Sequence, residues 1–288
     1  ITLVEDNKDL GEVVVVGFGK QAKANLTGSV AQIKSEDLQS RPVQNVSSAL
    51  QGLMPGVSVT AGQGRPGADG STIRVRGVGT LNNASPYILV DGVETNNLNS
   101  IDPNDIESIS VLKDAASAAI YGSKASNGVI LITTKRGKVG KPVVTYSGNV
   151  GFLNATRLVE RLTSAEYAEM LNFALKDNGK PERFTAAEIE KFRNGSDPDN
   201  YPNTDWYDLA FKTGVQHSHS FNVTGGTETV KYMAAAGYMN QQGILESSNR
   251  ERFSIRTNLD FTFSPRLTGH AGLNFINNDY DDPNNNYV

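Results

Sequence analysis

The side chains that most often perform chemistry in proteins are few in this sequence, and they are not spaced for catalysis. Its 288 residues include no cysteine, so a thiolate nucleophile and a cysteine metal site are both unavailable. The histidines His217, His219 and His270 lack the spacing of a zinc site, and the acidic residues 278–284 lack the final glutamate of an EF-hand. No motif places a nucleophile beside a base. We therefore predict that the protein is not an enzyme and has no catalytic residues, metal site or cofactor.

The glycine-rich residues 62–67 (GQGRPG) are similar to a phosphate-binding loop in composition only. No helix start follows them, and no lysine with serine or threonine completes a P-loop. We interpret residues 62–67 and 81–85 as two surface loops. Their residues Arg65, Asn82 and Asn83 are candidate ligand contacts, because amide side chains can hydrogen-bond to sugar hydroxyls and to peptide groups.

An extended run near the start of the chain is the other candidate site. It consists of Glu12, Val13, Val14, Val15, Val16 and Gly17. Such a β-branched run can pair edge to edge with a strand of a partner, because main-chain hydrogen bonds make little demand on side chains. The alternative is an ordinary buried strand, which the run taken alone favours.

Charge and hydropathy narrow the classes of partner and location. The chain has 27 basic and 31 acidic residues and a formal net charge of -4, so it offers no polycationic surface for nucleic acid. No apolar run reaches the roughly 18 residues that a spanning helix needs. A membrane barrel stays possible, because its strands are short and only half apolar. The first residues lack a secretory signal, so we expect a chain that is either cytosolic or already processed.

Up to about residue 138, short β-branched runs between glycines predict strands. They are residues 28–33, 57–60, 72–75, 87–90, 108–112 and 129–134. Helices are predicted over residues 46–53 and 115–121, the second opened by Asp114 and closed by Gly122. Some strands are separated by helices and others by turns, which favours an α+β domain with a mixed sheet.

After residue 138 the predicted strands are longer and alternate strictly between apolar and polar residues. They are residues 143–152, 218–224, 230–239, 254–263 and 267–275. In the fourth, Ile255 and Leu259 share one face while Arg256 and Asn258 share the other. Lipid outside and water inside would explain this alternation, and a soluble antiparallel sandwich would explain it equally well. Residues 163–211 form a polar excursion with two predicted helices, residues 163–175 and 187–193.

Four segments, in this order, carry a resemblance to a known family. Residues 10–19 (LGEVVVVGFG) lead into residues 46–57 (VSSALQGLMPGV). Residues 73–77 (IRVRG) are followed by residues 86–93 (PYILVDGV), and residues 101–135 complete the series. In this order they resemble the TonB-box region and plug domain of the SusC/RagA family of TonB-dependent (TonB-linked) outer-membrane transporters. The motifs cover most of the first 138 residues.

The resemblance implies a fold, a location and partners. The expected fold class is an α+β plug domain with a mixed sheet, followed by the antiparallel β-strands of a transmembrane β-barrel that is incomplete in this chain. We expect a TonB-box region or linker over residues 1–19, the plug over 20–138, and the first barrel strands with an inserted helical extracellular loop over 139–288. The location is the outer membrane of a Gram-negative bacterium, in contact with its lipid. The expected partners are TonB, a SusD-like surface lipoprotein and an oligosaccharide or peptide ligand.

In that setting, the position of Glu12–Val16 directly before the plug favours a TonB-binding strand over a buried one. The function implied is TonB-dependent import of nutrients, with the plug gating the barrel. Two alternatives remain at this point. One is a surface glycan-binding protein or adhesin, and the other is a signal-transducing outer-membrane receptor.

Overall fold

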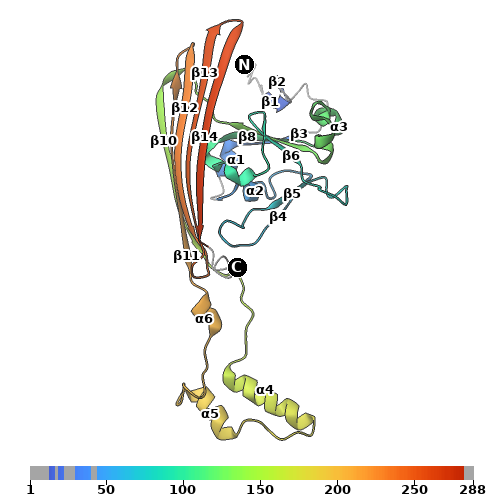
Figure 1. Ribbon diagram of the computed structural model, residues 1–288, viewed down its shortest axis with the longest axis vertical. Helices are drawn as coiled ribbons and strands as arrows, with labels where there is room; N and C mark the ends of the chain where they lie inside the picture. Colours follow the sequence, from blue (N-terminus) through green and yellow to red (C-terminus); the bar gives the residue numbers. More distant parts are fainter. Residues whose placement is uncertain (1–12, 17–18, 23–29, 40–43, 282–288) are drawn as a thin grey trace, which may run out of the picture. The chain divides into compact units, whose positions relative to one another are not determined.

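The computed structural model describes residues 13–16, 19–22, 30–39 and 44–281 (Figure 1). The chain divides into two compact units. The first contains residues 1–151, 216–241 and 249–281, and the second contains residues 152–215, 242–248 and 282–288. Within the described ranges, no helix is both long enough and apolar enough to cross a membrane.

The α+β domain of the first unit is built on a mixed five-stranded sheet. Its strand order is β3 (Val30–Lys34), β8 (Ile106–Leu112), β9 (Val129–Thr134), β6 (Tyr87–Val90) and β7 (Val93–Glu94). The β6–β9 pair is parallel and the other three pairs are antiparallel. The predicted mixed sheet is therefore confirmed, and the predicted bounds of β6 and β9 are those observed.

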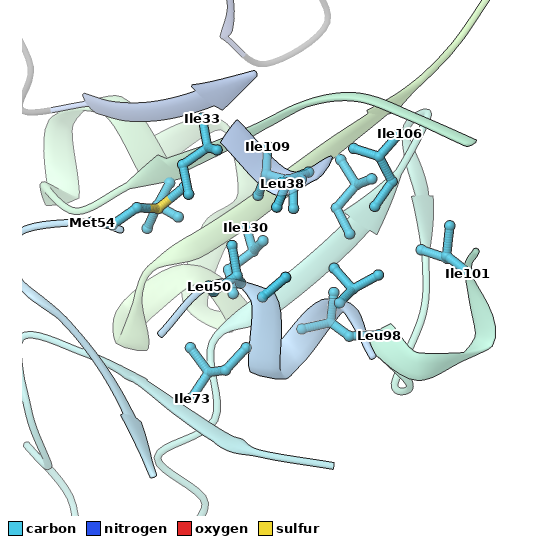
Figure 2. Packing of buried hydrophobic residues seen from close by; sticks show 14 of the residues in the cluster. Ile33, Leu38, Leu50, Met54, Ile73, Leu98, Ile101, Ile106, Ile109 and Ile130 are labelled. Atoms are coloured by element: carbon cyan, nitrogen blue, oxygen red, sulfur yellow. The ribbon is translucent and has the colours of Figure 1, made fainter. Parts of the chain in front are cut away.

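Helices cover both faces of this sheet because β8 and β9 are apolar on both sides. Ile109 and Ile130 pack with Leu38 of α1 (Ser35–Gln39) and Val46 of α2 (Val46–Ala49), in the cluster drawn in Figure 2. Other apolar residues of β8 and β9 point the other way. Leu112, Val129 and Leu131 pack with residues of α3 (Ala115–Ala118) and of the 3₁₀ segment η4 (Ala119–Asn127).

The helices of the α+β domain are shorter than predicted. Helix α2 ends at Ala49, and Gly52 and Gly56 then adopt positive φ angles of 73° and 77°. Helix α3 gives way to the 3₁₀ segment η4 after one turn, and that segment is interrupted at Gly122 (φ 66°, ψ −152°), the predicted stop. Asp114 stands at the start of α3, but its side chain makes no capping hydrogen bond there.

Two strand pairs and two 3₁₀ turns complete the described part of the domain. The hairpin β4 (Val57–Thr60) and β5 (Thr72–Val75) has the predicted bounds, and Ile73 of β5 packs into the main cluster. The 3₁₀ turns η2 (Leu98–Ser100) and η3 (Pro103–Asp105) lead into β8. Near the start of the chain, β1 (Val13–Val16) pairs antiparallel with β2 (Gly19–Ala22).

A second sheet follows, called here the large sheet. Its five strands lie in sequence order: β10 (Gly140–Leu153), β11 (Gly214–Gly226), β12 (Val230–Gln242), β13 (Asn249–Ser264) and β14 (Leu267–Asp281). The pairs β11–β12 and β13–β14 are antiparallel. Each strand is longer than predicted. Residues 227–229 and 265–266 make short turns at one end, while residues 154–213 and 243–248 make the longer connections at the other.

The second unit carries three helices: α4 (Ser164–Asp177), α5 (Ala186–Asn194) and α6 (Trp206–Ala210). The first two match the predicted helices, and α6 was not predicted. Thr163 and Thr185 each begin a helix with a complete capping box. The threonine side chain accepts a hydrogen bond from the backbone N–H of a glutamate three residues later, and that glutamate accepts one from the threonine N–H. Asn172 of α4 binds the backbone of Phe184 through both its amide nitrogen and its amide oxygen, which joins the two helices.

Candidate functional site

The polar face of β13 is the buried face. Arg252 and Asn258 are each 2% exposed, whereas Phe253 and Ile255 between them are 42% and 37% exposed. This inverts the usual arrangement in a protein, in which the apolar face of a strand is inside. The predicted division of β13 into a polar and an apolar face is correct, and the structure adds that the polar face lies against the α+β domain.

Three arginines of β13 meet three aspartates of the α+β domain. The side chains of Arg252 and Asp102 approach within 3.1 Å, and Arg256 Nε lies 3.3 Å from Asp105 Oδ2. Arg250 lies 3.7 Å from Asp69. We call this set the arginine ladder. Removing one member of a buried ion pair leaves an uncompensated charge away from water, so the ladder resists separation of β13 from the domain.

Hydrogen bonds to uncharged groups add to the arginine ladder. Arg252 also donates to the carbonyl of Gln44, and Arg250 donates to Asn45 Oδ1 at 2.9 Å. Asn258 donates to Thr134 Oγ1 and to the carbonyl of Lys135. These contacts give partners to hydrogen-bond donors that would otherwise be buried without one. Buried charged side chains are tolerated in a protein only when they are hydrogen-bonded in this way.

Gly237 of β12 has no side chain, which leaves room for Ser254 and for Asp102 of the arginine ladder to lie close to its backbone. A Cβ atom at Gly237 would lie 2.6 Å from Ser254 Oγ and 2.9 Å from Asp102 Oδ2. Both distances are too short for real contacts. A side chain at position 237 would therefore displace the carboxylate that Arg252 binds.

Asp105 is the ladder residue whose ionisation is most perturbed. Burial raises the pKa of its carboxyl group to about 6, and the nearby charge of Asp102 acts in the same direction. The guanidinium of Arg256 lowers this pKa but does not offset burial. Asp105 therefore changes charge at a mildly acidic pH.

The sequence motif DGV brings Asp91 to a sharp turn with a φ of 49°. Its two carboxylate oxygens accept hydrogen bonds from the backbone and the hydroxyl of Thr134, at 3.0 and 2.5 Å. Asp91 also lies 4.0 Å from Arg136. Arg76, directly after β5, pairs with Asp114, which follows the end of β8.

The α+β domain contains two adjoining polar cavities that share Ser85, Pro86, Ile88 and Asn96. The first, of about 380 Å³, is lined by residues of β5, β6 and η2, and the second, of about 580 Å³, extends toward η4. In the second, Lys124 and Glu94 form an ion pair at 2.8 Å, and the hydrogen bond from Lys124 lowers the pKa of Glu94. Serine, threonine and asparagine residues supply most of the remaining lining.

The predicted ligand residues meet these cavities only in part. Asn83 lines the second cavity, where its side chain accepts from the backbone of Ser85 and its carbonyl accepts from Asn127. Asn82 and Arg65 line neither cavity. The cavity residues Asn96, Asn97 and Asn99 were not predicted, although the density of amides directly after the DGV motif could have indicated them.

The predicted TonB-binding run is described only at Val13–Val16. Glu12 and Gly17 lie outside the described residues. The valines pair with Gly19–Ala22, so one edge of β1 is occupied by the chain itself. Among the described residues, β1 and β2 form a sheet of two strands, and the second edge of β1 has no strand beside it.

Comparison with known proteins gives a consistent result. Residues 22–129 match the family model of the TonB-dependent receptor plug domain. The chain is 39% identical to TonB-dependent receptor P26 of Formosa agariphila, over 99% of this chain and 28% of that protein. It is 37% identical to TonB-dependent receptor SusC of Bacteroides thetaiotaomicron, over 96% of this chain and 27% of that protein.

Comparison with solved structures points to the same kind of protein. The RagAB peptide importer in its open-open state superposes with a TM-score of 0.80 at 30% identity, covering 94% of this chain and 33% of that chain. The chain thus spans between about a quarter and a third of the proteins it matches. Residues 22–129 are a TonB-dependent receptor plug domain, and the chain belongs to the TonB-dependent receptors of the SusC/RagA type.

Proposed function

We propose that this chain forms the plug and part of the barrel wall of an outer-membrane importer that takes up nutrients under the control of TonB. The observation that carries the proposal is the inverted large sheet, whose polar face binds the plug through the arginine ladder. The wall of a membrane barrel separates lipid from a hydrated interior, so it needs an apolar outer face and a polar inner face.

The outward face of the large sheet supports a membrane location. Tyr146, Val150, Phe253, Leu273 and Phe275 each expose between 42% and 66% of their surface. A contiguous apolar face of this kind is unfavourable in water and favourable in lipid. The short turns at one end and long connections at the other fit the periplasmic and external ends of an outer-membrane barrel.

The plug would gate the barrel, and β1 would be the strand that TonB engages. The free edge of β1 supports this assignment, because a partner strand could add to it through main-chain hydrogen bonds. We keep residues 1–19 as the TonB-binding linker, 20–138 as the plug and 139–288 as wall strands with an external helical insertion.

The proposed cargo is an oligosaccharide or a peptide, received together with a SusD-like surface lipoprotein. Support comes from the relative named SusC and from the structural neighbour described as a peptide importer. The amide and hydroxyl groups of the two cavities suit both kinds of cargo.

Proline substitution of β1 in the whole receptor tests the proposal. Val14→Pro with Val15→Pro removes two main-chain donors, and we expect loss of energised uptake while ligand binding to outer membranes is kept. The matched control is Val14→Ala with Val15→Ala, which keeps both donors and should retain uptake. Normal uptake by the proline variant would overturn the assignment of β1.

A further inference from the structure

The first cavity of the plug contains a single charged side chain, and it is a cation. Arg74 of β5 lines this cavity together with hydroxyl and amide residues, and neither an aspartate nor a glutamate is among the described residues of the lining. The neighbouring cavity differs, because its charges Lys124 and Glu94 neutralise each other.

Arg74 also differs from five other arginines of the same unit. Arg76, Arg136, Arg250, Arg252 and Arg256 each pair with an aspartate. Arg74 uses Nη1 to donate to the carbonyl of Ile73 at 2.9 Å and to Ser85 Oγ at 3.3 Å. Within the described part of the chain, its Nε and Nη2 groups have no partner. A half-buried guanidinium with free donors is a strong attractor for a planar anion, since its fork matches a carboxylate.

Asn96 supplies uncharged donors and acceptors beside it. This residue lines both cavities, and its side-chain amide makes no hydrogen bond to any described residue. An amide presents two donors and an acceptor, which suit hydroxyl or peptide groups next to a bound carboxylate.

The first cavity lies beside a contact between the plug and the end of β12. Its lining residue Gly70 directly follows Asp69, which accepts a hydrogen bond from Gln241 at 3.0 Å. Gln241 is the penultimate residue of β12, at the end of that strand where residues 243–248 begin. In the proposed barrel this is the external end, where cargo arrives.

We propose that the first cavity binds a carboxylate of the incoming cargo, with Arg74 as the ion-pair partner and Asn96 as a flanking hydrogen-bonding residue. The inference rests on the proposed import function and specifies its cargo as anionic. The same chemistry could come from a uronate-containing oligosaccharide or from a free peptide terminus.

Binding measurements with the whole receptor in detergent test this inference. The probes are a short oligogalacturonate with its methyl ester, and a short oligopeptide with its carboxy-terminal amide. In each pair only the carboxylate differs. We expect at least one carboxylate probe to bind the wild-type receptor roughly tenfold or more tightly than its neutral twin, the usual effect of a hydrogen bond to a charged group.

Arg74→Gln should abolish this preference, and Arg74→Lys should keep part of it, because lysine retains the charge without the planar fork. Arg266→Gln, in the exposed turn between β13 and β14, is the matched control and should leave the preference unchanged. The preference of one probe pair over the other identifies the source of the carboxylate. The proposal is wrong if neither carboxylate is preferred by the wild type, or if the preference survives in Arg74→Gln.

The assay distinguishes this inference from the proposed function. Binding in detergent needs neither TonB nor an energised membrane, so a failure of import leaves the binding result intact. Conversely, a receptor that imports cargo but shows no carboxylate preference would refute only the role of Arg74.

Discussion

Arg252 of β13 and Asp102 of the plug form an ion pair at 3.1 Å, and their side chains retain only 2% and 7% of their exposure. The two residues are 150 positions apart in the sequence. A buried ion pair contributes little more net stability than a well-packed pair of apolar residues would. Removing only one of its two charges is nevertheless strongly destabilising, because the other charge stays buried without a partner. It therefore specifies where the plug attaches to the large sheet.

Removing only Arg252 should weaken this attachment strongly. We expect Arg252→Met to lower the free energy of opening of residues 101–112 by about 3 kcal/mol, because Asp102 is left buried without its cation. The double variant Arg252→Met with Asp102→Asn should recover most of the loss, since asparagine is neutral and its oxygen can still cap Asn104. Amide hydrogen exchange measures both values.

A surface pair provides the control for this experiment. Lys212 and Glu246 lie 2.8 Å apart with side chains 58% and 73% exposed. Glu246→Gln should change local stability far less than Arg252→Met does, because solvent screens an exposed ion pair. If Arg252→Met is no more damaging than Glu246→Gln, the arginine ladder does not hold the plug.

Asp105 should make stability depend on pH in the mildly acidic range. Its folded pKa of about 6 lies above the ordinary value of 3.8, so between these values the folded state keeps a proton that the unfolded state has lost. Its contribution is fully present below about pH 4 and is lost as pH rises through about 6. The total is on the order of 3 kcal/mol.

Asp105→Asn isolates this effect. The difference in unfolding free energy between wild type and Asp105→Asn should change with pH between about 4 and 6 and then level off. Denaturant titrations at several pH values measure it. A difference that stays constant from pH 4 to pH 7 would show that Asp105 titrates normally.

Gly237 should tolerate no side chain. We expect Gly237→Ala to cost roughly 1–3 kcal/mol, because its Cβ would overlap Ser254 Oγ and Asp102 Oδ2. Gly64→Ala is the matched control, since a Cβ at Gly64 would meet no atom within 4 Å. Denaturant unfolding of both variants checks the prediction, which fails if the two are equally stable.

The capping box of α4 should stabilise the second unit locally. Thr163→Ala removes the hydrogen bonds that Thr163 Oγ1 makes with Glu166, and we expect a loss of about 1 kcal/mol in helix stability. Thr204→Ala, at an exposed position outside the helices, should have almost no effect. Amide exchange of residues 164–170 compares them, and equal protection in both variants would contradict the capping role.

Local sequence patterns predicted the elements of the plug well. Strands such as β6 and β9 are bounded by glycine, proline or charged residues, which interrupt β-branched runs where the strands end. Alternation also predicted which residues of β13 share a face. Helix α3 was less predictable, because its length depends on tertiary packing of Ala118 and Ala125 beneath β9 rather than on a capping signal.

The site was harder to predict because its partners are distant in sequence. Nothing near Asp105 indicates that Arg256 will cover it, and nothing near Asp91 indicates that its carboxylate will bind Thr134. Arg65 and Asn82 were chosen for their place in polar loops, whereas lining a cavity also requires a facing wall, which β6 and η2 provide. Loop composition alone does not contain that information.

The arginine ladder and the register of β3 together determine how the plug would resist a pulling force applied at β3. Val30 of β3 pairs with Leu112, and Lys34 pairs with Ser108, so the first residue of β3 lies far from the start of β8. Asp105, directly before β8, is held by Arg256. A pull applied at Val30 and resisted at Asp105 would act along the strands and load every β3–β8 hydrogen bond at once. Strands loaded in shear resist far more force than strands peeled apart one bond at a time, so the edge of the plug nearest the proposed TonB strand would act as a mechanical threshold.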